Sequence, residues 1–182
     1  MAILDIVRLG HPALKSPAVA VADPTASEIA VLAQNMAETL EESGGVGLAA
    51  PQVGVGLRLV MFFVPPTRGG GEPVPLTVLI NPEITPLDDE TAEAYEGCLS
   101  IPGMTGMVPR WKRIRYRGVG LDGQAIDRIA EDFHARVVQH ECDHLDGRVY
   151  LSRMTGLDSL TYVDELLRAR GETEPREEER PE

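Results

Sequence analysis

Residues 139–144, Gln-His-Glu-Cys-Asp-His, have the types and spacing to bind a metal ion and activate a water molecule. His140 and His144 are four positions apart, so on a helix both imidazoles point the same way and can hold one ion. Glu141 follows about 100° further around the helix axis, where its carboxylate can reach a water at the metal without ligating the metal. The segment therefore predicts a hydrolytic metal site.

The residues around this motif favour a single buried helix. Asp132 is a suitable N-cap, Gly147 suits the position after the helix end, and no proline or glycine lies between them. Phe133 and Val137 share a stripe with the two histidines. A second apolar stripe lies nearly opposite and consists of Val138, Cys142 and Leu145. We expect this helix to be the central one of the domain, although ordinary core histidines are the alternative interpretation.

A third metal ligand is available in residues 96–100, Glu-Gly-Cys-Leu-Ser. Cys98 stands there in a turn-like setting, where a thiol is exposed enough to react or to ligate. With His140 and His144 it completes a three-ligand set, which a catalytic site with an open position requires. A packed core thiol is the alternative. Cys142 lies about 200° around the helix from His140 and should pack away from the metal as a small buried hydrophobe.

Residues 45–54 form a small, glycine-rich and nearly uncharged segment. Glycines and alanines allow a ligand or another backbone to approach closely. Gln52 offers a neutral side-chain amide that can donate to an oxyanion. The lysine and the Ser/Thr of a phosphate-binding loop are missing, so that function is excluded. A tight turn that leads into the next strand is the alternative.

Length, composition and charge limit the class of protein. A chain of 182 residues suits one globular domain, which we expect at residues 1–170, followed by a disordered acidic tail at residues 171–182. The net charge of −12 argues against general binding of nucleic acid or of anionic membranes. The sequence has no apolar stretch of about 20 residues and no N-terminal signal, so a cytoplasmic location is expected. Two cysteines imply no disulfide framework.

The remaining pattern predicts the elements that position these residues. A helix begins at a capping box, residues 25–28, and ends at Gly44. Strands are expected at residues 3–9, 57–64, 78–80 and 148–151, a hairpin at 111–121 and 124–129, and a final helix at 157–167. His134 lies off the ligand stripe and is expected to be exposed. The head group of Arg136 is expected to reach a carboxylate away from the substrate.

Considered together, three segments resemble the motifs of the peptide deformylases. Residues 45–52 fit the first motif of that family, residues 96–100 the second and residues 140–144 the third, in the same order and spacing. The resemblance spans residues 3–168, and within the family the chain is similar to the type I enzymes of bacteria and endosymbiotic organelles. It implies an α+β fold in which antiparallel β-sheets pack around a central metal-bearing α-helix.

The resemblance also implies a reaction, the removal of the N-formyl group from the N-terminal formylmethionine of newly made polypeptides with release of formate. A divalent metal ion would be held by Cys98, His140 and His144. Glu141 would take the proton of the attacking water and pass it to the leaving amine. The side chain of Gln52 and the backbone N–H of Leu99 would stabilise the oxyanion.

Substrate binding is implied in the same way. Relatives bind the peptide as an added strand, and the matching backbone positions here are Val46, Gly47 and Gly97. Phe133 and Val137, two turns and one turn before His140 respectively, are expected to line an apolar pocket for the methionine side chain. Plain core packing is the alternative for both.

The metal and the partners follow partly from the donor set and partly from the resemblance. A Cys-His-His set with an open position usually suggests zinc. The resemblance suggests Fe(II) in the cell, with Zn, Ni or Co able to substitute. The expected partners are N-formylmethionyl nascent peptides, met at the ribosome, without direct binding of nucleic acid or membrane.

Two other functions remain open at this point. A zinc endopeptidase would need a further ligand, but Tyr150 occupies the position of a third histidine, which leaves Glu165 as the candidate. A catalytically silent relative would only bind formylated or acetylated N-termini. Intact Glu141, Gln52 and metal ligands argue against this second alternative.

Overall fold

The computed structural model describes residues 2–68 and 73–172. In chain order the elements are η1 (Pro12–Leu14), α1 (Ser27–Ser43), β1 (Gly47–Ala49), η2 (Ala50–Val53), β2 (Leu59–Val64), β3 (Val74–Pro86), β4 (Thr91–Cys98), β5 (Ile101–Trp111), β6 (Arg113–Val119), β7 (Ala125–Glu131), α2 (Asp132–Leu145), η3 (Tyr150–Arg153), β8 (Thr161–Tyr162) and α3 (Val163–Arg170), where η marks a 3₁₀ helix. Residues 173–182 of the predicted acidic tail lie outside the described part of the chain. Among the described residues, no helix has the length and apolar character needed to cross a membrane.

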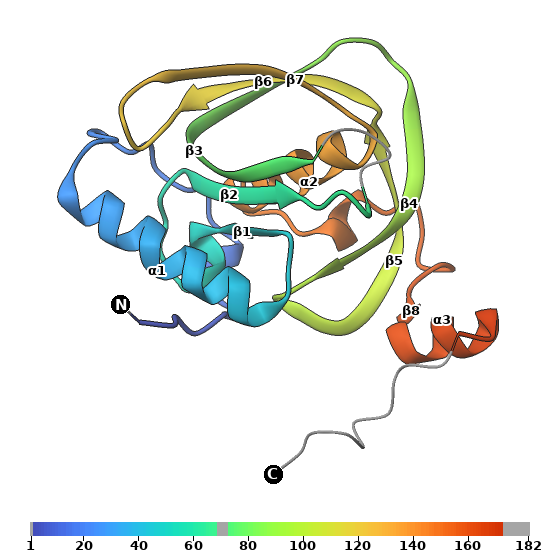
Figure 1. Ribbon diagram of the computed structural model, residues 1–182. Helices are drawn as coiled ribbons and strands as arrows, with labels where there is room; N and C mark the ends of the chain where they lie inside the picture. Colours follow the sequence, from blue (N-terminus) through green and yellow to red (C-terminus); the bar gives the residue numbers. More distant parts are fainter. Residues whose placement is uncertain (1, 69–72, 173–182) are drawn as a thin grey trace.

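Two antiparallel sheets lie on either side of helix α2 (Figure 1). The larger sheet has the strand order β1-β2-β3-β6-β7, and the smaller sheet has the order β4-β5-β8. Every strand pair within these sheets is antiparallel. The α+β class and the central helix predicted from the sequence are therefore confirmed.

Helix α2 is buried along nearly its whole length. All residues from Ala135 to Leu145 are buried, as its two apolar stripes predicted. The helix begins one residue earlier than expected, because Glu131 is its N-cap and Asp132 already belongs to its first turn. Gly147 follows the helix with φ +68, a conformation that L side chains rarely adopt, and a Cβ there would lie 2.8 Å from the backbone of Lys15.

Strand β2 explains why residues 57–64 are almost entirely apolar. Successive side chains of a strand point to opposite faces. Val60 and Phe62 pack in the cluster that contains α2, whereas Leu59 and Met61 pack in the cluster that contains α1. Both faces of the larger sheet are thus covered by a helix at β2, and α1 lies on the face away from α2 (Figure 1).

Two predicted strands do not form, the final helix has other bounds than predicted, and one predicted capping box is absent. Residues 3–9 form no strand, because their main chain bonds to two separate segments, from Val7 to Gln52 and from Leu9 to Ser100. Residues 148–151 lead into the 3₁₀ helix η3, and the final helix begins only at residue 163, after β8. The capping box does not form, since Ala26 is the N-cap of α1 and the Thr25 hydroxyl donates to Asp23.

His134 is half-buried, which corrects the prediction that it is exposed. Its ring lies 5.7 Å from that of Phe62 and 5.5 Å from that of Tyr116, between centroids. Burial, together with the positive charge of Arg128, lowers the pKa of His134 to about 4. The folded protein therefore keeps this imidazole neutral at a pH where the unfolded chain protonates it.

This difference predicts a pH-dependent stability. Below about pH 6.5 the unfolded state binds a proton that the folded state does not, so the free energy of unfolding falls as the pH drops towards 4. Between pH 8 and pH 5 the loss due to His134 should be about 2 kcal/mol, at about 1.4 kcal/mol per pKa unit. Urea unfolding at both pH values should show that His134→Leu removes this part of the loss. His11→Asn, at an exposed position, is the matched control, and an equal effect of both variants would contradict the prediction.

Candidate metal site and peptide groove

The three predicted metal ligands lie together. The potential ligand atoms of Cys98, His140 and His144 are all within 4.8 Å of one another, and Cys98 Sγ is 3.4 Å from His144 Nε2. Both histidines are buried and Cys98 is half-buried. One sulfur and two imidazole nitrogens at this spacing fit a divalent metal ion with an open coordination position.

The end of strand β4 brings Cys98 to helix α2. The register of the β4–β5 pair shifts between Gly97 and Cys98, so that Cys98 pairs with Ile101 across a tight turn. Such an irregularity bends a strand and redirects its side chains. The turn-like setting inferred from the sequence therefore places the thiol beside the histidines.

Glu141 lies close to strand β1 and next to the ligand group. Its side chain is buried, and its Oε2 atom has no hydrogen-bond partner among the described residues. Gly47 of β1 packs against it, since a Cβ at this position would lie 2.7 Å from Cδ of Glu141. Burial raises the pKa of Glu141 to about 7. A carboxylate with an unused oxygen in such a place can accept and return a proton.

Gln52 is held so that its amide NH₂ group points to the site. Its Oε1 accepts a hydrogen bond of 2.9 Å from the backbone N–H of Ala49. Its Nε2 consequently faces Cys98 Sγ at 3.5 Å and Ser100 Oγ at 3.4 Å. The side chain is almost completely buried, so the amide is preorganised as a donor.

A buried cluster of ion pairs holds the Nδ1 side of the His140 ring. The Oε2 atom of Glu96 lies 2.8 Å from His140 Nδ1. Arg110 donates to both oxygens of Glu96 at 2.9 Å, and Arg136 donates to Oε1 at 2.7 Å. Burial opposes ionisation of Glu96, but the hydrogen bonds from His140 and Arg110 outweigh it and hold the pKa of this carboxyl well below its usual range. The expectation that Arg136 binds a carboxylate is confirmed.

Sequence reasoning missed several members of this surrounding shell. Glu96 belongs to a quoted motif but received no role, and Arg110 was not singled out. Tyr150 was considered only because it is not a histidine, yet its ring stacks on that of His140, with centroids 6.4 Å apart and planes inclined by 19°. None of these contacts has a local sequence signal, because each joins two different elements of the fold.

A cavity of about 400 Å³ lies over the ligand group. The residues predicted for substrate binding and for the oxyanion line it together: Val46, Gly47, Gln52, Gly97, Leu99, Phe133 and Val137. Cys98, His140 and Glu141 also line it. Glu165, the ligand needed for the endopeptidase alternative, is exposed on α3 and pairs with Arg168. The structure therefore brings together the predicted site residues and leaves Glu165 on the surface.

A buried helix with two histidines and an adjacent glutamate, beside a cysteine from a strand, is the arrangement of a hydrolytic metalloenzyme. A model of the polypeptide deformylase family matches residues 3–159. The chain is 49% identical over 166 residues to peptide deformylase 1 of Nitrosomonas europaea, covering 90% of this chain and 94% of that one. It is 53% identical over 140 residues to peptide deformylase 2 of Pseudomonas syringae pv. tomato, covering 76% and 78%. The chain belongs to the peptide deformylase family, whose members remove the N-formyl group from nascent polypeptides.

Solved structures agree with this assignment. The class I type b peptide deformylase of Acinetobacter baumannii with bound Met-Ala-Ser has a TM-score of 0.78 and 32% identity, covering 84% of this chain and 99% of that one. The peptide deformylase of Ehrlichia chaffeensis in complex with actinonin has a TM-score of 0.80 and 34% identity, covering 86% and 91%.

The contact between Gly47 and Glu141 predicts the effect of one added methyl group. In Gly47→Ala the new Cβ would displace the Glu141 carboxylate, and a misplacement of about 1 Å can cost about 100-fold in rate. We expect this loss in kcat for a formyl-Met peptide with an unchanged metal content. Gly56→Ala, where a Cβ meets nothing within 4 Å, is the control. Wild-type kcat in Gly47→Ala would show that this contact does not position the carboxylate.

Proposed function

We propose that this chain hydrolyses the formyl amide of N-terminal formylmethionine and that a divalent metal ion held by Cys98, His140 and His144 takes part. The observation that carries the proposal is the meeting of these three side chains with the buried, partly unpartnered carboxylate of Glu141. A divalent ion bound by this donor set would lower the pKa of a water molecule towards 7 and polarise a carbonyl oxygen.

The residues around the ligands account for the proton and charge transfers. Glu141 takes the proton from the attacking water and delivers it to the amine that leaves. The Nε2 group of Gln52 and the backbone N–H of Leu99 donate to the oxyanion that develops on the formyl oxygen. Apart from its amide oxygen and nitrogen, the formyl carbon carries only a hydrogen atom. The site therefore needs no space for a further carbon substituent at this position.

Two sheet edges make the proposed binding site for the peptide. Strand β1 is at the edge of the larger sheet and β4 at the edge of the smaller one, and residues of both line the cavity. An edge strand presents main-chain donors and acceptors to another chain. The peptide adds as a strand at Val46, Gly47 and Gly97. Phe133 and Val137, on the stripe of His140, receive the methionine side chain.

The remaining properties are proposed from the family and from the sequence. Fe(II) is the ion in the cell, and Zn, Ni or Co can replace it. The protein works in the cytoplasm on nascent peptides met at the ribosome, and it binds neither nucleic acid nor membrane. Residues 1–170 form one catalytic unit of the type I class, with residues 171–182 as an acidic extension.

A formate-release assay tests the proposal. Protein purified without oxygen and loaded with Fe(II) or Ni(II) should release formate from a formyl-Met peptide. Glu141→Gln should retain the metal and lose about 100- to 10,000-fold in kcat, which is the usual contribution of general acid–base catalysis. The acetyl-Met peptide is the control substrate. Undetectable formate from the metal-loaded wild-type protein would instead support a relative that only binds blocked N-termini.

Metal analysis separates the deformylase site from an endopeptidase site. Cys98→Ala removes one of three donors and should leave less than about a tenth of the bound metal after dialysis against a chelator. Glu165→Ala, at the exposed position on α3, should retain the wild-type metal content. The opposite pattern would assign the third ligand to Glu165.

A further inference from the structure

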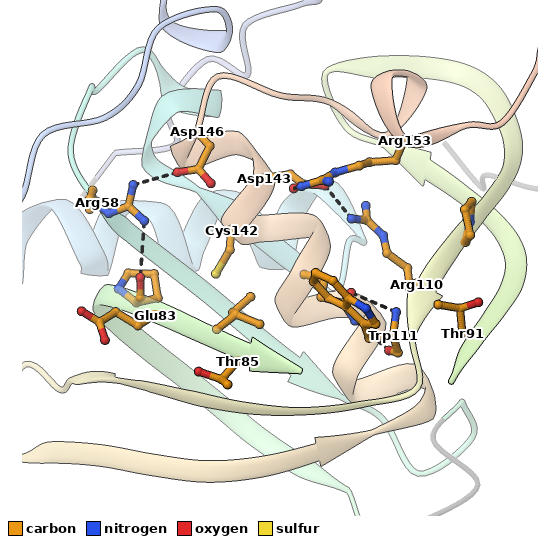
Figure 2. Close-up of a pocket in the computed structure, with 14 residues that line it drawn as sticks. Arg58, Glu83, Thr85, Thr91, Arg110, Trp111, Cys142, Asp143, Asp146 and Arg153 are labelled. Atoms are coloured by element: carbon orange, nitrogen blue, oxygen red, sulfur yellow. Dashed lines mark hydrogen bonds and ion pairs between the residues drawn. The ribbon is translucent and has the colours of Figure 1, made fainter. Parts of the chain in front are cut away.

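A second cavity, of about 730 Å³, is lined by other residues of helix α2 than those that line the cavity over the metal ligands (Figure 2). Its lining includes Cys142, Asp143 and two arginines that contact Asp143, namely Arg110 of β5 and Arg153 of η3. Cys142 faces this cavity and not the metal ligands, as its position on the helix predicted. Neither Arg153 nor Asp143 has a role in the reaction derived above.

A continuous series of charged contacts leads from this cavity to a metal ligand. Arg153 donates to Asp143 through Nη2 at 2.5 Å and through Nε at 3.1 Å. Arg110 donates to the same carboxylate through Nη1 at 2.5 Å, and its Nε and Nη2 bind Glu96 at 2.9 Å. Glu96 in turn binds Nδ1 of His140 at 2.8 Å.

Burial differs sharply along the series. The side chains of Glu96, Arg110 and Asp143 are only 4–5% exposed, whereas that of Arg153 is 36% exposed. Arg153 is thus the end of the series that reaches the solvent. Figure 2 shows its side chain directed towards Asp143. The interior members depend on one another, because a buried charge without its partner is costly.

We propose that Arg153 is a positioning residue for the metal ligand His140 and acts through Asp143, Arg110 and Glu96. Asp143 accepts hydrogen bonds from two guanidinium groups. Without Arg153, the negative charge of Asp143 is compensated by Arg110 alone. The guanidinium group of Arg110 is then drawn towards Asp143 and away from Glu96. Glu96 then holds the imidazole of His140 less firmly, and residues that orient a metal-bound histidine affect both metal affinity and ligand geometry. The inference rests on the proposed metal site.

A merely structural role predicts a different result. If Arg153 only fastens η3 to α2, its loss lowers the free energy of unfolding and leaves the metal environment unchanged. The absorption spectrum of the Co(II)-substituted protein and the rate of Co(II) loss to a chelator therefore distinguish the two roles. Cobalt binding by the wild-type protein, and its loss in Cys98→Ala, first establishes that the probe is at this site.

The test compares Arg153→Met with a matched control. Arg115 also binds one carboxylate through two nitrogens, Asp127 at 2.6 and 2.7 Å, and is 44% exposed, but it lies on β6 and does not contact the site. Arg153→Met should shift the Co(II) bands and speed cobalt loss about 10-fold, at the lower end of effects known for groups that support metal ligands. Arg115→Met should stay within about twofold of the wild type. An unchanged spectrum and rate in Arg153→Met, or an equal change in Arg115→Met, overturns the proposal.

A double-mutant cycle with Glu96→Gln tests the route. If Arg153 acts through Glu96, Arg153→Met adds little to cobalt loss in the Glu96→Gln background, whereas full additivity overturns the proposal. Should Arg153→Met fail to fold, Arg153→Lys replaces it. This variant keeps the charge without the two-nitrogen fork and should still shift the Co(II) bands from their wild-type positions, and a wild-type spectrum overturns the proposal. Formate release by the wild-type protein is measured separately, so the proposed function and this positioning role can fail independently.

Discussion

The buried carboxylate of Glu96 is the contact on which the geometry of the site depends. It comes from β4, two residues before Cys98, and binds His140 of α2 and Arg110 of β5. One side chain thus fixes the strand that supplies the sulfur to the helix that supplies the imidazoles. Withdrawing these charges from water costs several kcal/mol per ion, about as much as their attraction returns. The cluster is therefore better understood as a device for orientation than as a source of stability.

The larger fold serves the same purpose. Helix α2 is enclosed between the two sheets. Its burial leaves the side chains of its histidines little freedom to rotate. Strand β2 is covered on both faces, which anchors β1 and, with it, Gly47 next to Glu141. The closeness of Gly47 to this carboxylate explains why the glycine-rich segment must lack side chains where it passes the helix.

The sequence allowed prediction of those features that repeat along one segment or match a motif. The 3.6-residue period around His140 predicted the buried helix, and the apolar run at residues 57–64 predicted a strand. Strand β5 was missed because Pro102, Gly103, Gly106 and Pro109 interrupt it, although its long pairing with β4 stabilises it. Glu96 and Tyr150 received no role, since their partners lie 44 and 10 residues away along the chain and no local spacing marks such contacts. His134 was misplaced because periodicity on one helix does not show which sheet lies opposite.

The edge position of β1 and β4 has a consequence for the range of proteins that can be processed. The main-chain N–H and C=O groups are the same in every residue except proline, which lacks the N–H, so the proposed strand pairing at these edges would distinguish little between one second or third amino acid and another. Selectivity then falls on the blocked methionine, the feature common to all newly started chains. Such an enzyme is selective for the first residue of the peptide and accepts many different residues after it.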